Sequence, residues 1–133
     1  MAHVKGIQDR VFFTGPRTDV DDFYTVSDVF LLPTHYDPFS NVVLEAMNFG
    51  TVVFTTRQNG ASEILDQRFV MNSSEDFSVV DKISDLLADP EELNKVKLQN
   101  RQRSCCFSMD CNLEETLEVI GQTMRSEFSD LKA

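Results

Sequence analysis

The chain contains no tryptophan and few of the residues that interrupt or cross-link a fold: five glycines, four prolines and three cysteines among 133 residues. Cys105, Cys106 and Cys111 are odd in number and crowded together, a pattern that fits neither a disulfide framework nor the spacing of zinc ligands. We therefore expect reduced thiols on a helix, as in a protein of a reducing compartment.

Long apolar runs and an excess of basic charge are also missing. No stretch approaches the roughly 18 consecutive apolar residues of a membrane-spanning helix, and the N-terminal MAHVKGIQDR lacks the apolar centre of a signal peptide. Twelve basic against 22 acidic residues give a net charge of -10. That charge disfavours general binding to nucleic acid or anionic membranes, although one local phosphate site remains compatible with it. A cytoplasmic location is expected.

What is present is the composition of a globular domain, with 41% hydrophobic and 26% charged residues. We expect one domain over residues 1–133, with no internal repeat and no low-complexity linker. Its first half alternates strand and helix signals. Four runs rich in β-branched and aromatic residues predict strands at residues 11–14 (VFFT), 29–32 (VFLL), 51–56 (TVVFTT) and 68–71 (RFVM).

Helical segments are predicted between these strands. A cap and an acidic first turn at residues 18–22 (TDVDD) begin a helix with Val20, Phe23 and Tyr24 on one face. A second helix is expected from about residue 40 to 49, ended by Gly50. Asn59 and Gly60 turn the chain into a short helical piece, ASEIL. Apolar strands separated by helices favour a parallel α/β sheet covered on both faces.

The C-terminal part, residues 75–128, is predicted to be helical. One apolar stripe consists of Phe77, Val80, Ile83 and Leu87. A longer stripe, at spacings of four and three, consists of Leu113, Leu117, Ile120, Met124 and Phe128. Between the stripes, residues 89–92 (DPEE) form a capping box with proline at the first helical position.

Glu45 is the one charge in the apolar segment VVLEAMNF. A buried carboxylate needs a partner, which leaves two interpretations open: a structural ion pair, or acceptance of hydrogen bonds from a bound ligand. The loop THYDPFSN precedes this helix at the carboxyl end of a predicted strand, where α/β sheets collect ligands. Ser40 is a suitable N-cap, and the N–H groups of Ser40, Asn41 and Val42 would form an anion cradle.

Four blocks of the segment from Arg10 to about Leu65 carry a resemblance to a known family. They are VFFTG, SDVFLLPT, DPFSNVVLEAM and G-TVVFTT-RQNGASEI, in that order. The segment resembles the C-terminal, donor-binding domain of the retaining GT-B glycosyltransferases of group 1 (family four). The resemblance implies a Rossmann-like parallel sheet with flanking helices, here an incomplete GT-B C-terminal domain. It also implies transfer of a sugar from a nucleotide-diphosphate sugar to an acceptor hydroxyl, with retention.

The roles of the family motif carry over to named residues here. Asp37, the first acid, would hold hydroxyls of the donor sugar, and Glu45, the second, would accept hydrogen bonds from the ribose. These two are the expected catalytic residues. The other expected donor-binding residues are Phe39, Ser40 and Asn41, through their backbone amides on the diphosphate, together with Arg17 and Gly60.

Two of these assignments keep a plain alternative. Arg17 is either a contact for the base or phosphate or a solvated loop arginine. Gly60 either allows close approach of the ligand or simply completes a hairpin-like turn. Two departures from the family pattern also stand out: Asp37 replaces the usual glutamate, and Ser40 replaces the usual glycine. Small or polar residues there are similar to those of some lipopolysaccharide-core transferases, a hint about subfamily.

The family's acceptor-binding N-terminal domain and the first two strands of its C-terminal domain have no counterpart in this sequence. In the family's strand order 3-2-1-4-5-6 those strands separate VFFTG from VFLLPT, so these two should not touch. Either the chain is a piece of a longer enzyme, or its sheet closes up, or another polypeptide completes it. Unpaired strand edges would favour self-association, and the chain alone is expected to be inactive.

The leading hypothesis is therefore the donor-binding half of a glycosyltransferase of glycan, lipopolysaccharide or other polysaccharide biosynthesis. Its acceptor would be a sugar or glycolipid bound by the missing domain, and the complete enzyme would be cytoplasmic or peripheral at the membrane. The alternative is a non-catalytic fragment or interaction module with the same fold. We expect no metal and no cofactor besides the donor substrate, and interpret Asp19 and Asp21 as first-turn helix acids rather than a metal motif. His35 is interpreted as a plain loop residue.

Overall fold

The computed structural model describes residues 6–130, with the side chains of all of these except residues 109 and 126–130. A three-stranded parallel sheet forms its centre, in the order β1 (Val29–Leu32), β2 (Val52–Thr56) and β3 (Val70–Met71). Val29 lies opposite Val52, and Thr55 opposite Val70. The predicted parallel α/β architecture is confirmed. β2 is the middle strand, and all five of its residues are buried.

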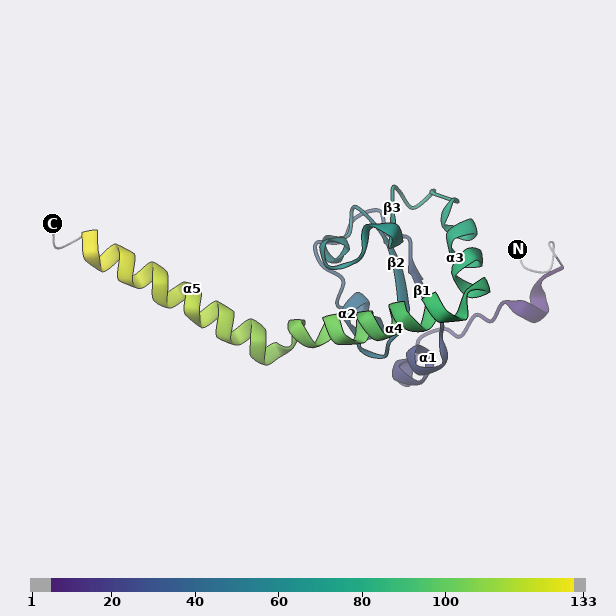
Figure 1. The fold of residues 1–133 in the computed structure, drawn as a ribbon, viewed down its shortest axis with the longest axis horizontal. Coiled ribbons are helices and arrows are strands. Elements are labelled where there is room, and N and C mark those ends of the chain that lie inside the picture. Colours follow the sequence, from purple (N-terminus) through teal and green to yellow (C-terminus); the bar gives the residue numbers. More distant parts are fainter. Residues whose placement is uncertain (1–5, 131–133) are drawn as a thin grey trace.

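Helices and short 3-10 turns connect the strands. The α-helices are α1 (Val20–Val26), α2 (Asn41–Asn48), α3 (Val79–Ala88), α4 (Pro90–Ser104) and α5 (Met109–Asp130). The 3-10 turns are η2 (Gln8–Arg10), η3 (Gly60–Ile64), η4 (Gln67–Phe69) and η5 (Cys105–Phe107). Figure 1 shows α4 crossing one side of the sheet and α5 leading away from it.

Each face of the sheet carries its own core. Val53 of β2 points to one face, where Tyr24 of α1 and Met47 of α2 cover it. Val52 and Phe54 of the same strand point to the other face, which α3 and α4 cover. Successive side chains of β2 thus contribute to the apolar cores on opposite faces of the sheet. Because both faces are covered, this strand is apolar or β-branched throughout rather than alternating with polar residues.

The predicted strand at residues 11–14 is absent. These residues lie outside the sheet, and the side chains of Phe12 and Phe13 are 80% and 88% exposed. A strand exists only when a neighbour satisfies its backbone donors and acceptors, and the described part of the chain offers none beside it. Residues 11–15 and β1 do not pair, as expected, and β1 forms one edge of the sheet.

The other three predicted strands and the helix ending at Gly50 are present. β3 is shorter than predicted because the Asp66 carboxylate accepts a hydrogen bond from the Arg68 N–H at 3.0 Å, which turns residues 67–69 into η4. α2 is shorter than predicted by one residue at each end. Gly50 follows it with φ +79, a conformation that glycine adopts at little cost.

Of the apolar stripe predicted at Phe77, Val80, Ile83 and Leu87, only Ile83 packs against the core. Val79 and Leu86 are buried, and Ile83 packs against them, whereas Phe77, Val80 and Leu87 are 78%, 58% and 47% exposed. Both sets have helical spacing, and packing against the sheet and α4 decides between them. α1 shows the same effect on a smaller scale, because only Tyr24 of its predicted face is buried.

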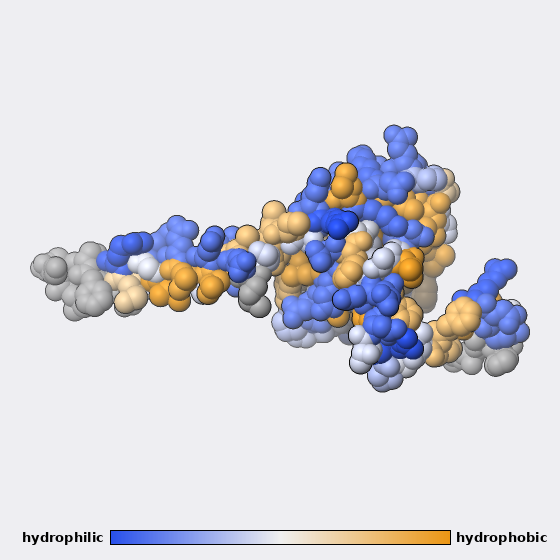
Figure 2. All heavy atoms as spheres, turned by 90° about the horizontal axis from the view of Figure 1, so that it is seen from below, coloured by the Kyte–Doolittle hydropathy of each residue, from blue (hydrophilic) through white to orange (hydrophobic). Residues whose placement is uncertain are grey.

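α4 begins where the sequence predicts. The Asp89 carboxylate accepts hydrogen bonds from the N–H groups of Glu91 and Glu92, both at 3.1 Å, and Pro90 is the first residue of α4. Leu113, Leu117, Ile120 and Met124 follow one side of α5 and are 50–59% exposed; the side chain of Phe128 is outside the described residues. Figure 2 shows this apolar side of α5 next to a hydrophilic one.

Cys105 and Cys106 lie exposed in η5, and Cys111 is half-buried in α5. All three are free thiols, as predicted. Among the described helices, none is long and apolar enough to cross a membrane.

Candidate functional site

The loops that follow the three strands meet at the carboxyl edge of the sheet. Two buried threonines of β2 hold the end of β1 and the start of the loop that follows it, residues 33–40. The Thr55 hydroxyl donates to the Leu32 carbonyl at 3.0 Å, and the Thr56 hydroxyl donates to the Thr34 carbonyl at 2.7 Å. This edge is where ligands of open α/β sheets bind.

Asp37 is the best-anchored residue of this loop. Its N–H donates to the Gln58 carbonyl at 3.2 Å, and its carbonyl accepts from the Gly60 N–H at 2.9 Å. Its carboxylate turns back onto its own loop: Oδ1 accepts from the Phe39 N–H at 3.1 Å, and Oδ2 accepts from the Ser40 hydroxyl. The predicted first acid is half-buried. These hydrogen bonds hold its carboxylate in one orientation.

Gly60 allows the loop that contains Pro38 and Asp37 to lie close to the turn after β2. A Cβ built on Gly60 would lie 1.8 Å from the carbonyl oxygen of Pro38 and 2.9 Å from its carbon. Its φ is not positive, so space rather than backbone conformation requires glycine here. The close contact is with the chain's own loop, which explains this glycine without a contact to ligand.

Asn59 is a site residue for which the sequence pattern predicts only a turn. It is fully buried. Its Oδ1 accepts from the N–H groups of Ser40 (3.3 Å) and Ala61 (3.0 Å), and its Nδ2 donates to the Thr55 hydroxyl at 3.1 Å. The Asn-Gly pair signalled the turn, but nothing in the local sequence indicated that the amide would reach a residue 19 positions earlier.

The predicted anion cradle at the start of α2 is only partly available. The Ser40 N–H is bound to Asn59 and the Phe39 N–H to Asp37, so neither points freely outward. Ser40 is the N-cap residue, as predicted, but its hydroxyl binds Asp37 and makes no cap hydrogen bond. Asn41 and Val42 open the helix, where N–H groups have no intrahelical acceptor. Phe39 and Asn41 also line a cavity of about 420 Å³ whose opposite wall is η5 and the start of α5.

Glu45 is exposed, so the expectation of a buried acid is wrong. The apolar neighbours Val43, Ala46 and Met47 turn into the core, and Glu45 lies on the outer side of α2. Among the described residues it has no ion-pair partner, which removes the structural ion pair as its explanation. The buried Tyr24 places its hydroxyl 3.5 Å from Oε2 and donates to it. Burial, and secondly the Glu45 charge, raise the pKa of Tyr24.

Arg17 makes its contacts within its own segment. Its Nε donates to Asp19 Oδ1 at 2.7 Å, and its guanidinium lies 5.4 Å from the centre of the Phe23 ring. The hydrogen bond from Arg17 lowers the pKa of the Asp19 carboxyl group. The structure does not bring Arg17 to the loop of Asp37. His35 lies in that loop, with Nδ1 3.1 Å from the Ser74 hydroxyl.

A second polar cluster joins the ends of β2 and β3. The Asp76 carboxylate accepts from the Ser78 hydroxyl at 2.6 Å and from the Asn72 N–H at 3.0 Å. Asn72 in turn accepts from the guanidinium of Arg57. The hydroxyl of Ser78, and next the N–H of Asn72, lower the pKa of Asp76 to about 2.

We expect Asp76→Asn to lower the melting temperature at neutral pH, because the amide keeps only one acceptor oxygen and its NH2 group cannot accept the hydrogen bonds made to the other. A carboxyl group with a depressed pKa stabilises the fold above its unfolded value of 3.8 and loses that effect as the pH falls toward about 2. The difference between parent and variant should therefore shrink over this range in thermal unfolding. Asp85→Asn on α3, which removes no described hydrogen bond, is the control. A difference in melting temperature that does not change with pH would contradict a stabilising role of the ionised Asp76 carboxylate.

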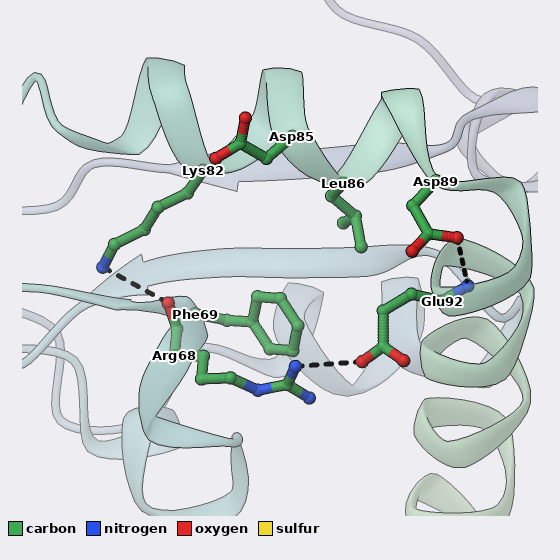
Figure 3. Close-up of a pocket in the computed structure, with 7 residues that line it drawn as sticks. All are labelled: Arg68, Phe69, Lys82, Asp85, Leu86, Asp89 and Glu92. Carbon is green, nitrogen blue, oxygen red and sulfur yellow. Dashed lines mark hydrogen bonds and ion pairs between the residues drawn. The ribbon is translucent and has the colours of Figure 1, made fainter.

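The molecule has a further cavity, of about 550 Å³, between η4, α3 and α4 (Figure 3). Phe69 and Leu86 form its apolar wall, and none of the predicted site residues lines it. Most of its polar groups already have partners: Arg68 Nη1 lies 2.9 Å from Glu92 Oε1, and the Lys82 ammonium donates to the Arg68 backbone carbonyl at 3.3 Å. The geometry therefore favours the carboxyl edge of the sheet as the candidate site.

Comparison with known proteins decides the family. The family described as Glycosyl transferases group 1 matches residues 1–103. The chain belongs to this family. The matched region contains the whole sheet together with Asp37, Glu45 and Asn59. The match shows group 1; retention and family four belong to the resemblance described above.

Two curated relatives illustrate the similarity. The chain is 34% identical over 92 residues to N-acetyl-alpha-D-glucosaminyl L-malate synthase of Bacillus anthracis, covering 67% of this chain and 24% of that protein. It is 32% identical over 83 residues to the lipopolysaccharide core biosynthesis mannosyltransferase LpsB of Rhizobium meliloti, covering 62% of this chain and 22% of the relative. The chain therefore matches about a quarter of each relative.

The fold is also that of solved glycosyltransferase structures. Anabaena HepE in complex with UDP superposes with a TM-score of 0.71 at 22% identity, covering 89% of this chain and 35% of that one. Its complex with UDP-glucose gives a TM-score of 0.69. This similarity confirms the predicted GT-B type of α/β fold.

Proposed function

We propose that this chain is the donor-binding half of a glycosyltransferase that moves a sugar from a nucleotide-diphosphate sugar to an acceptor hydroxyl with retention. The observation that carries the proposal is the Asp37 loop, which hydrogen bonds hold at the carboxyl edge of the sheet; Asp37 lies eight residues before the exposed Glu45 of α2. Both acids lie in the family-matched region. Binding of UDP and UDP-glucose by Anabaena HepE, a protein of the same fold, supports a nucleotide sugar as the donor.

In this proposal each acid has a distinct partner. Glu45, exposed and lightly restrained by Tyr24, accepts hydrogen bonds from the ribose hydroxyls. Asp37 accepts hydrogen bonds from hydroxyls of the transferred sugar. The diphosphate lies at the start of α2, where the N–H groups of Asn41 and Val42 point out of the helix. Gly60 acts indirectly, because it lets the Asp37 loop approach β2.

The chemical step gains from electrostatic stabilisation of the leaving diphosphate, whose negative charge grows in the transition state. Helix-terminal N–H groups supply part of that stabilisation in this chain. The basic residues that complete it belong, in our proposal, to the strands and the domain that this chain does not contain. The reaction uses the donor substrate without a resident metal, and the complete enzyme works in the cytoplasm or at the membrane surface.

Lipopolysaccharide or other polysaccharide biosynthesis is the proposed process, because the relative LpsB is a lipopolysaccharide core mannosyltransferase. A non-catalytic module with the same fold is the second candidate. The three-stranded sheet with β1 at its edge favours it, because that edge is a surface for another polypeptide. Sugar transfer by the chain joined to an acceptor domain would support the donor-binding half and exclude the non-catalytic module.

A thermal-shift panel of UDP-, GDP- and ADP-sugars tests the proposed donor site. A ligand present at about 100-fold its Kd should raise the free energy of unfolding by roughly 2.7 kcal/mol. We expect one nucleotide class to stabilise the chain and the matching nucleoside monophosphate to do so less. If no nucleotide sugar shifts the melting temperature at millimolar concentration, the donor-binding proposal fails.

The chain alone is expected to self-associate and to transfer no sugar. Holding donor and acceptor face to face supplies about 7–11 kcal/mol of barrier reduction, and this chain contributes one wall of that cleft. The edge of β1 and the exposed Phe12 and Phe13 favour contacts between copies. Light scattering should show concentration-dependent association, and adding the upstream half of a family member should restore a single species and activity. A monomeric chain that transfers sugar unaided would refute this expectation.

A further inference from the structure

We propose that Ser40 is a positioning residue that sets the Asp37 carboxylate for recognition of the donor sugar. This inference rests on the proposed function and goes beyond it, because the family pattern has glycine at the position of Ser40 and gives it no side-chain role. The hydroxyl of Ser40 is the only side-chain donor to Asp37 among the described residues.

The Asp37 carboxylate is held but not saturated. Oδ2 accepts from the Ser40 hydroxyl, and Oδ1 accepts from the Phe39 N–H at 3.1 Å. Each carboxylate oxygen has two lone pairs, so each keeps one acceptor position. The half-buried group can therefore accept two further hydrogen bonds from sugar hydroxyls without rotating away from its loop.

Ser40 is itself fixed through the protein interior. It is 7% exposed, and its N–H donates to Oδ1 of the fully buried Asn59 at 3.3 Å. The other end of that amide donates to the Thr55 hydroxyl on β2, and this hydroxyl donates to the Leu32 carbonyl on β1. A continuous set of hydrogen bonds thus joins the two neighbouring strands to the carboxylate. Such a supporting shell preserves the orientation of a binding group.

The two departures from the family pattern form one unit. Aspartate is one methylene shorter than glutamate, so its carboxylate stays within reach of the residue three positions later. Serine at that position supplies a donor that glycine lacks. A glutamate at position 37 would carry its carboxylate beyond the Ser40 hydroxyl, and glycine at position 40 would leave the Phe39 N–H as the one remaining described donor to Asp37. The residues at positions 37 and 40 should therefore act non-additively when they are exchanged.

Calorimetry on the 133-residue chain tests the positioning role. The two probes are the UDP-, GDP- or ADP-sugar that gives the largest thermal shift and its parent nucleoside diphosphate. For Ser40→Ala we expect the preference for the nucleotide sugar over the bare diphosphate to fall about fivefold, the usual effect of one lost hydrogen bond. The Kd for the bare diphosphate should change less than about twofold. Ser84→Ala removes a helical serine hydroxyl on α3 and should leave both Kd values unchanged.

A double-mutant cycle provides the second measurement. Asp37→Glu alone should lose sugar preference, and the double variant Asp37→Glu with Ser40→Gly, which restores the family pattern, should regain it. Additive losses in this cycle, or equal losses for both probes in Ser40→Ala, would assign Ser40 a purely structural role and overturn the inference. A parent chain that binds neither probe would instead refute the proposed function, and the inference with it.

Discussion

Glu45→Gln is expected to weaken binding of the nucleoside diphosphate by about 10- to 150-fold and to leave the fold intact. Charge-assisted hydrogen bonds to the ribose, worth about 1.5–3 kcal/mol each, would be lost while side-chain volume is kept. Glu45 is exposed and has no ion-pair partner within the described chain, so the free energy of unfolding should change by less than about 0.5 kcal/mol.

Calorimetry for binding and urea titration for stability measure the two effects on the same variant. Glu114→Gln, on the exposed side of α5, removes an equal charge far from the sheet and should change neither quantity. The alternative outcome is a variant that unfolds more easily and binds nucleotide as the parent does. That result would make Glu45 a structural residue through its contact with Tyr24.

Gly60→Ala is expected to disrupt both the fold and the site. The added Cβ would lie 1.8 Å from the Pro38 carbonyl oxygen, a backbone atom that cannot move without displacing the loop. Overpacking of this kind costs about 1–3 kcal/mol of stability. Because the Gly60 N–H also holds the Asp37 carbonyl, the displaced loop should lose the orientation of Asp37, and donor binding should become undetectable.

Gly121→Ala is the matched control for this substitution. Gly121 lies in α5, and the nearest side chain to an added Cβ among the described residues is that of Arg125, at 3.7 Å, an ordinary van der Waals distance. Alanine in a helix interior is favoured over glycine by about 1 kcal/mol, so this variant should be as stable as the parent or more stable. If Gly60→Ala matched it in urea titration and nucleotide binding, the close approach of the two loops would not be essential.

The local sequence was sufficient for the elements that carry their own signals. VFLL and TVVFTT predicted β1 and β2, Gly50 predicted the end of α2, and residues 89–92 predicted the start of α4. Strand propensity, glycine at a helix end and a capping carboxylate all act within a few residues, so they can be read without the fold. The order of the four sequence blocks likewise predicted the family that the match over residues 1–103 shows.

Long-range packing decided the rest. Residues 11–14 have strand composition, but no strand lies beside them in residues 6–130. The apolar residues around α3 were compatible with more than one buried face, and packing against the sheet and α4 decided which one is buried. The apolar residues around Glu45 in the sequence predicted a buried side chain, yet Glu45 is exposed on the outer side of α2. Asn59 reaches Ser40 across 19 positions, and Gly60 makes room for Pro38. Composition and spacing determined which segments become helices and strands, because those preferences are local. Only the tertiary structure decided which faces are buried and which polar groups remain free to bind a ligand, because burial and hydrogen-bond partners depend on residues distant in the chain.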